Sequence, residues 1–257
     1  MPDDAPLTFD SVEEAKSVFE YGRGLFISTH TAQTSSDSAH SHADIIPNIS
    51  IFEALMSRYS FALQAFVKSK SPSFTPRERI AVAVLKLNLL SSYLSVYIEL
   101  SPPDKKASWK NYMPQFEEML DLAEKVLSFI STTDDRGPTT FFCLDMGIVS
   151  PLYTLASQCG DPTIRRKAIT LLRSTSRQEG LWNSFFVAKA IERIMDIEER
   201  ALGGICGCTD DPDRVMPSNI EPLLGIDGNG GWLRKIRQEA FADSQVKFVE
   251  GLLFGRP

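Results

Sequence analysis

Three histidines offer the clearest metal-binding chemistry in this sequence of 257 residues. His40 and His42 form a His-x-His pair, and Asp37 or Asp44 could supply a third ligand to a transition metal. The three histidines, His30, His40 and His42, all lie within residues 28–48. That stretch is rich in Ser, Thr, Ala and Asp and has no apolar period, which is typical of a solvated, flexible loop. We therefore expect no metal site.

Catalytic patterns are absent from the sequence. With no histidine outside 28–48, a Ser or Cys nucleophile would lack its ordinary general base. No Gly-x-Ser-x-Gly turn, phosphate-binding loop or dinucleotide fingerprint occurs, and Gly-Asn-Gly-Gly at 228–231 is too short to hold a phosphate. Adjacent carboxylates such as Glu117-Glu118 and Glu198-Glu199 would point about 100° apart on a helix. We predict no enzyme, no catalytic residue and no cofactor.

The cysteines do not match a zinc pattern. Cys206 and Cys208 flank a single glycine, whereas structural zinc sites usually separate paired cysteines by about two to four residues. Cys143 and Cys159 lie in apolar segments that we expect to be helical, where cysteine acts as a small core residue. No secretory signal precedes them, so free thiols and an intracellular protein are expected.

One local cluster departs from the net charge of −6. The basic residues are Arg165, Arg166, Lys167, Arg173 and Arg177. At helical spacing Arg166 and Arg173 share a side, so Arg165, Arg166, Lys167 and Arg173 form a candidate partner surface for phosphate or an acidic protein. An ordinary solvated helix face is the alternative. The overall acidity disfavours stand-alone binding to nucleic acid.

The N-terminal half predicts helices around a long apolar one. Ser11 and Glu14 form a capping box for a first helix that Gly22 and Gly24 would close. A second helix is predicted over residues 51–70. Thr75-Pro76-Arg77-Glu78 begins a third, apolar on nearly all sides, that ends before Pro102-Pro103. Its 80–100 stretch is long enough to span a bilayer, but Lys86 and Glu99 interrupt it, and a buried central helix is favoured over a membrane span.

The C-terminal half predicts further helices and then an irregular end. Apolar spacing predicts an amphipathic helix over 114–130, followed by a polar seam at 131–140. Helices are expected from Ser150-Pro151, from Asp161-Pro162 and from Trp182 to Gly203. Residues 203–231 are dense in Gly, Pro, Asp and Cys and indicate an irregular excursion, after which a helix over 232–242 and a strand over 246–249 are expected. The predicted class is all-α: one domain over 1–257 around a long central helix, with a short irregular or β-containing C-terminal extension.

The stretch from Phe141 to Leu202 carries a recognisable pattern. It contains F-F-C-L-D-M-G-I-V-S-P-L-Y, A-S-Q-C-G-D-P-T-I-R-R-K-A-I-T-L-L, R-Q-E-G-L-W and I-E-R-I-M-D-I-E-E-R-A-L. This resembles the C-terminal regulatory region of fungal binuclear-zinc-cluster transcription factors, and the upstream half is similar in a looser way. The signature residues are Gly147, Pro151, Asp161, Pro162, Arg177, Glu179, Gly180 and Trp182. They look structural: prolines begin helices, glycines permit tight turns, and an Arg177–Glu179 pair would direct Trp182 into the core.

The resemblance implies a regulator of transcription in the nucleus of a fungal cell, with a metabolic gene cluster as the expected target. Its partners would be proteins of the transcription machinery, a zinc-cluster regulator or a small-molecule effector. The six-cysteine zinc cluster of the family does not occur in this sequence, so direct DNA binding is not expected. The alternative is a helical small-molecule-binding protein or a shape-based enzyme of a biosynthetic pathway, which a deep apolar cavity would favour.

Overall fold

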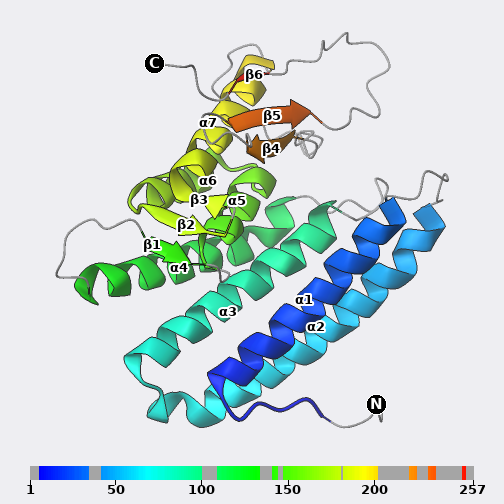
Figure 1. Ribbon diagram of the computed structural model, residues 1–257, viewed down its shortest axis with the longest axis vertical. Coiled ribbons are helices and arrows are strands. Elements are labelled where there is room, and N and C mark those ends of the chain that lie inside the picture. The colour runs from blue at the N-terminus through cyan, green and yellow to red at the C-terminus, as the bar shows by residue number, and fades with distance from the viewer. Residues whose placement is uncertain are drawn as a thin grey trace. The chain divides into compact units, whose positions relative to one another are not determined.

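The computed structural model describes residues 6–34, 42–99, 109–133, 141–143, 147–180, 182–201, 220–224, 231–235 and 251–252. These residues form two compact units, Met1–Ala107 and Ser108–Pro257, and each unit is considered by itself. Helices make up most of the described residues in both units, which confirms the all-α class (Figure 1). The organisation of 1–257 as one domain stays a prediction.

Three long helices pack side by side in the first unit (Figure 1). They are α1 (Val12–Thr34), α2 (His42–Lys70) and α3 (Pro76–Leu94), with a 3-10 turn, η1 (Ser71–Ser73), before α3. The core residues are Val12, Ala15, Phe19, Phe52, Tyr59, Leu63, Phe66, Leu85, Leu87 and Leu94. The Tyr59 hydroxyl donates a hydrogen bond to the Ala15 carbonyl oxygen at 2.8 Å, which ties α2 to α1. Burial raises the pKa of Tyr59, so this phenol remains a donor.

The start signals of α1 and α3 form as the sequence predicts. The Thr75 hydroxyl accepts a hydrogen bond from the Glu78 backbone N–H at 3.2 Å, and the Glu78 carboxylate accepts one from the Thr75 backbone N–H at 2.7 Å. The Thr75 hydroxyl also donates a hydrogen bond to the Glu78 carboxylate at 2.7 Å, and this bond, together with the one from the Thr75 backbone N–H, lowers the pKa of Glu78. At α1 the Ser11 hydroxyl accepts from the Glu14 backbone N–H at 3.1 Å.

The prediction of a loop over 28–48 is wrong for those residues of the stretch that the structure describes. The backbone of α1 continues through Gly22 and Gly24 to Thr34, and α2 begins at His42 rather than near residue 51. A glycine inside a helix costs only about 1 kcal/mol relative to alanine, and packing against a neighbouring helix outweighs that. His30 and His42 thus belong to helices, whereas His40 and residues 35–41 lie outside the described residues.

The central apolar helix forms as α3 and continues as a π-helical turn, η2 (Ser95–Glu99). It packs against both α1 and α2. Among the described helices it is the one long and apolar enough to cross a membrane, over Pro76–Tyr97, and half of its most apolar stretch is buried within the protein. A core helix meets the same length and composition test, in keeping with the interpretation favoured from the sequence.

Four helices pack together in the second unit. They are α4 (Met113–Thr133), α5 (Val149–Gln158), α6 (Pro162–Arg173) and α7 (Ser184–Ala201), and a 3-10 turn, η4 (Trp109–Tyr112), precedes α4. Their core includes Phe116, Met119, Ala123, Leu152, Leu155, Ala168, Leu172 and Ile191. Cys159 is fully buried, as expected for a small core residue. A Cβ at Gly160 would collide with the Trp109 ring, so this glycine permits η4 to pack closely.

A small sheet links the segments around α5 and α6. Its strands are β1 (Phe141–Cys143), β2 (Arg177–Glu179) and β3 (Trp182–Asn183), in the order β1-β2-β3. β1 runs parallel to β2, with Phe141 opposite Arg177, and β2 pairs antiparallel with β3. The helical context predicted for Cys143 is therefore wrong, and Trp182 precedes α7 rather than beginning it. Strands this short leave no periodic signal in the sequence.

A second sheet confirms the β-containing C-terminal extension. It consists of β4 (Ile220–Leu224), β5 (Gly231–Lys235) and β6 (Gly251–Leu252), all antiparallel, with Leu223 opposite Trp232. The helix predicted to begin at Trp232 is wrong over Gly231–Lys235, because these residues pair with β4. The rest of that helix and the predicted strand at 246–249 lie outside the described residues, as do Cys206 and Cys208.

Candidate functional site

Helix α6 carries the basic cluster, and local capping fixes where it begins. One Asp161 carboxylate oxygen accepts hydrogen bonds from the backbone N–H groups of Thr163 at 2.7 Å and Ile164 at 3.0 Å. Pro162 occupies the first helical position, where its missing N–H is not needed. Both signature residues thus begin α6 as the sequence predicts. One face of α6 is buried and the opposite face is exposed to solvent.

Arg165 does not belong to the partner surface, contrary to the sequence prediction. Its side chain is only 1% exposed and forms an ion pair with Glu198 of α7, itself 7% exposed. The Nε and the second terminal nitrogen of Arg165 have no hydrogen-bond partner. Position 165 lies on the side of α6 that packs against α7, so its charge ties two helices together. The sequence did not reveal this, because Glu198 is 33 positions away.

The other three predicted surface residues are exposed. Arg166 and Lys167 lie on the solvent side of α6, and Arg173 is exposed at the last residue of the helix. Arg173 forms an ion pair with Glu192 of α7 at 2.6 Å, and its side chain is 49% exposed. Exposed pairs of this kind contribute at most about 1 kcal/mol. The basic face of α6 therefore consists of Arg166, Lys167 and Arg173.

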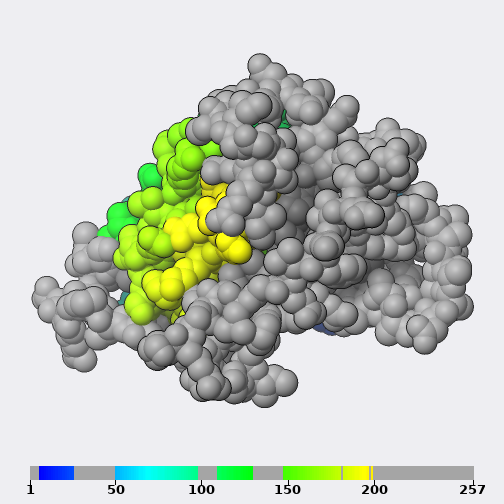
Figure 2. All heavy atoms as spheres, turned by 90° about the horizontal axis from the view of Figure 1, so that it is seen from above, coloured from blue at the N-terminus to red at the C-terminus, as the bar shows by residue number. Residues whose placement is uncertain are grey.

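An open hollow lies beside this basic face. It has a volume of about 310 Å³ and is lined by Glu124 of α4 and by Thr163, Arg166, Lys167, Thr170 and Leu171 of α6. Figure 2 shows the described residues of α6 and α7, in lime to yellow, gathered on one face. The lining offers both charge signs, two hydroxyl groups and one apolar side chain. Such a surface suits a macromolecular partner better than an enclosed small molecule, which needs a deeper apolar cavity.

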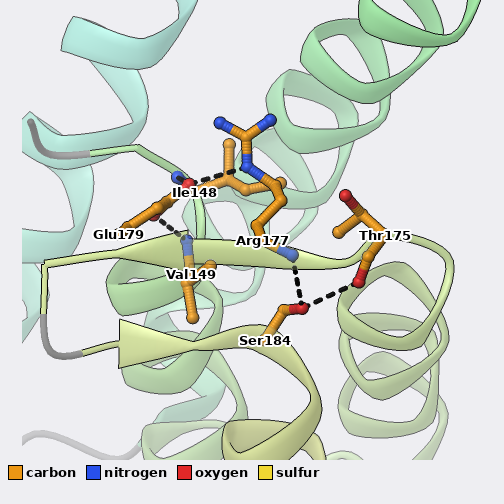
Figure 3. A network of polar contacts seen from close by, with 6 residues as sticks. All are labelled: Ile148, Val149, Thr175, Arg177, Glu179 and Ser184. Carbon is orange, nitrogen blue, oxygen red and sulfur yellow. Dashed lines mark hydrogen bonds and ion pairs between the residues drawn. The ribbon is translucent and has the colours of Figure 1, made fainter. Parts of the chain in front are cut away.

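The signature residues around β2 form a buried polar network (Figure 3). The Glu179 carboxylate accepts hydrogen bonds from the backbone N–H groups of Ile148 at 3.1 Å and Val149 at 2.8 Å. It also accepts one from the Arg177 Nε at 2.9 Å, and both side chains are buried. Glu179 therefore caps the N-terminus of α5 from a strand 30 residues away in sequence. The predicted Arg177–Glu179 pair exists, but in the interior.

Two glycines permit this arrangement. A Cβ at Gly147 would collide with the Glu179 carboxylate, so only glycine lets that carboxylate reach the start of α5. Gly180 has a φ of 56°, in the left-handed region, where the chain turns from β2 toward β3. Pro151 is buried in the first turn of α5, where proline is tolerated. Gly180 lies at a turn and Pro151 near a helix start, as the sequence suggested, whereas Gly147 leaves space for a carboxylate instead of forming the predicted tight turn.

The start of α7 depends on residues that the sequence analysis missed. The Asn183 side-chain oxygen accepts hydrogen bonds from the backbone N–H groups of Phe185 and Phe186, each at 3.1 Å. The Ser184 hydroxyl accepts from the Arg177 backbone N–H at 3.1 Å and donates to the Thr175 carbonyl oxygen at 2.7 Å (Figure 3). The sequence does contain a signal for this helix start, because Asn directly before an apolar helix is a preferred N-cap.

Trp182 differs from its predicted place in the core. It is partly exposed at the end of the small sheet, and its ring lies 5.3 Å from that of Tyr153 in α5. Pairing of β3 with β2 places Trp182 opposite Glu179 at the margin of the unit. The turn at Gly180 thus directs Trp182 against α5 rather than into the interior.

Metal-binding chemistry finds no support among the described residues, where no group of three or more His, Cys, Asp or Glu residues could hold an ion. The histidine side chains at 30, 40 and 42 fall outside the side chains that are described, and the metal interpretation is not tested by the structure.

Comparison with known proteins finds a similarity that covers part of the chain. The chain is 33% identical over 84 residues to the aspercryptin biosynthesis cluster-specific transcription regulator atnN of Emericella nidulans. The aligned part covers 33% of this chain and 14% of that protein. No family model matches the chain, and no solved structure matches it. The chain therefore contains a region related to a fungal transcription regulator, in keeping with the resemblance noted from the sequence.

Proposed function

We propose that this chain regulates transcription in a fungal cell and acts through protein contacts rather than through a DNA reader of its own. The observation that carries the proposal is the similarity to a fungal cluster-specific transcription regulator. By extension, the regulated genes form a metabolic gene cluster and the protein acts in the nucleus.

The second unit supplies a surface suited to such contacts. Arg166 and Lys167 are exposed on a helix that the Asp161 cap and the buried Arg165–Glu198 pair hold in place. Preorganised charges of this kind give specificity to protein association, because wrong partners meet like charge. The proposed partners are proteins of the transcription machinery or a zinc-cluster regulator. A small-molecule effector stays a prediction.

The hollow favours this role over a small-molecule-binding protein or a shape-based enzyme. Those alternatives need a cavity that surrounds most of a ligand with apolar side chains. The hollow beside α6 is open and lined mainly by Glu124, Arg166, Lys167 and two threonines. Because it is open to solvent, it can bind part of a protein surface but does not enclose a ligand.

Tethering tests the proposal directly. The full chain is fused to an unrelated DNA-binding domain, and a reporter gene carrying that domain's site is measured in fungal cells. We expect the fusion to raise or lower reporter transcription relative to the DNA-binding domain alone, because a regulator that works through proteins needs only to be brought to DNA. Chromatin immunoprecipitation confirms that both proteins occupy the site. An occupied site with unchanged transcription would contradict the proposal.

A further inference from the structure

Hydroxyl groups directly before a proline occur at three places among the described residues. These dipeptides are Ser71-Pro72, Thr75-Pro76 and Ser150-Pro151. A serine or threonine followed by proline is the acceptor that proline-directed protein kinases modify. Phosphoryl transfer also requires an accessible hydroxyl on a segment that the kinase can position in its active site. The structure separates the three dipeptides by these requirements.

Two of the three acceptors are held at helix starts. The Thr75 hydroxyl donates a hydrogen bond to the Glu78 carboxylate at 2.7 Å and accepts one from the Glu78 backbone N–H at 3.2 Å, so the cap of α3 occupies it. Ser150 lies in the first turn of α5, and the proline that follows it, Pro151, is buried. A kinase could bind either acceptor only after a helix start had opened.

Ser71 meets the requirements. It lies in η1, where Ser71, Pro72 and Ser73 are all exposed, and its hydroxyl has no hydrogen-bond partner among the described residues. The turn η1 contains no buried side chain, and a hydrogen bond of 3.3 Å from the Phe74 backbone N–H to the Ser71 carbonyl oxygen closes it. The residue before a proline readily adopts extended backbone, so η1 can open onto a kinase at little cost in stability.

We propose that Ser71 is a phosphorylation site for a proline-directed protein kinase, with ATP as the phosphoryl donor. The Ser71 Oγ attacks the γ-phosphorus of ATP. An Oγ–P bond forms, the bond from the γ-phosphorus to the bridging oxygen breaks and releases ADP, and the hydroxyl proton passes to the catalytic base of the kinase. This inference does not depend on the role in transcription.

The charges next to Ser71 suit the phosphorylated form. Lys68 and Lys70 lie three positions and one position before it, and both are exposed. Neither lysine forms an ion pair with a described residue. A phosphoserine carries a charge of about −1.5 to −2 at neutral pH, which the two lysines can balance. Modification therefore turns a locally basic segment into a nearly neutral one and leaves the helices on either side in place.

Incubation of the full chain with a purified mitogen-activated protein kinase and ATP tests the proposal, and peptide mass spectrometry measures the phosphate at each residue. We expect Thr75 and Ser150 to carry at least about tenfold less phosphate than Ser71, because their helix starts must open first. Pro72→Ala should lower phosphorylation of Ser71 at least about tenfold, since the kinase then loses the residue that it selects. Ser73→Ala is the matched control, because it changes the same exposed turn, keeps the Ser-Pro dipeptide and should leave phosphorylation of Ser71 unchanged.

A peptide of residues 66–78 separates the effect of the fold from that of the dipeptide. We expect Ser71 to be phosphorylated both in the peptide and in the full chain. Phosphorylation of Ser71 in the peptide but not in the chain would show that the fold withholds the site, and absence of phosphate from both would show that the dipeptide is not recognised. Either result overturns the proposal. A preference for Thr75 or Ser150 in the full chain, or equal phosphorylation of Ser71 with and without Pro72, overturns it as well.

Discussion

At the scale of single residues, the signature of the second unit is explained by one carboxylate. Glu179 receives two backbone N–H groups at the start of α5 and the Nε of Arg177, all inside the protein. Gly147 leaves the space that this carboxylate occupies, and Gly180 provides the turn that follows it. The pattern of glycines and charges therefore serves to join a strand to a distant helix rather than to perform catalysis.

Replacement of Gly147 tests the space requirement. Gly147→Ala places a Cβ against the Glu179 carboxylate, and we expect the free energy of unfolding to fall by about 1–3 kcal/mol, as overpacked sites do. Gly24→Ala is the matched control, because nothing lies within 4 Å of its Cβ in α1 and alanine favours helix. It should leave stability unchanged or raise it by up to about 1 kcal/mol. Urea denaturation measures both, and equal effects would refute the steric explanation.

Replacement of Glu179 tests the buried charge. Glu179→Gln removes the negative charge beside buried Arg177, and we expect a loss of about 3 kcal/mol, since an unpaired buried charge is costly. Glu192→Gln removes the partner of Arg173 at the surface and should cost less than about 1 kcal/mol. Thermal and urea unfolding compare the two variants. Similar losses of stability in the two variants would contradict the structural role assigned to the buried network around Glu179.

Acid unfolding tests the capping box of α3. Hydrogen bonds from Thr75 lower the pKa of Glu78 in the folded chain. The ionised Glu78 carboxylate therefore stabilises the fold fully at pH values above the pKa that the same group has in the unfolded chain. The stabilisation is lost as pH falls through the lower, folded pKa. Glu78→Ala should therefore lower the free energy of unfolding at neutral pH. The difference in free energy of unfolding between this variant and the unchanged chain should become smaller as the pH falls toward 3. A difference that stays constant with pH would contradict this assignment.

At the scale of elements, buried charge joins helices. The Arg165–Glu198 pair links α6 to α7, and both side chains are almost fully buried. Arg165→Met alone leaves the Glu198 carboxylate without this partner, and we expect it to destabilise the chain by about 3–5 kcal/mol. The double variant, Arg165→Met with Glu198→Leu, should regain most of the stability that Arg165→Met alone loses. Urea unfolding of the double-mutant cycle measures the coupling, and additive losses would contradict it.

Local signals explain why some elements were predictable from sequence. The boxes at Ser11 and Thr75 and the cap at Asp161 depend on residues three or fewer positions apart, so the sequence shows them directly. The β1-β2-β3 sheet pairs residue 141 with residue 177, and no local pattern reports such a contact. Burial of Arg165 was equally hidden, because a charged residue reads as exposed until its distant partner is known.

Polar composition misled the prediction where packing decides. Ser, Thr and glycine around residues 22–48 suggested a loop, yet α1 and α2 are helical over most of it. Single residues favour turns by fractions of a kcal/mol, whereas an extended contact between two helices outweighs several of them. The candidate site was predicted in part: Arg166, Lys167 and Arg173 are exposed as expected, but Arg165 is not.

At the scale of the whole molecule, a net charge of −6 coexists with a basic helix face. The net acidity disfavours binding to a nucleic-acid backbone, and binding of a protein partner at the basic face stays a prediction. The similarity of part of the chain to a cluster-specific regulator supports the proposed role in transcription. The proposed function therefore depends on contacts with other proteins at the promoters that they occupy.

The most direct measurement is the transcript profile of the host fungus with the gene for this chain deleted and then restored. Regulation of a metabolic cluster predicts that the transcripts of neighbouring biosynthetic genes change together on deletion and return on restoration. Transcripts that stay unchanged under conditions in which the chain is present in the nucleus would contradict the proposed role.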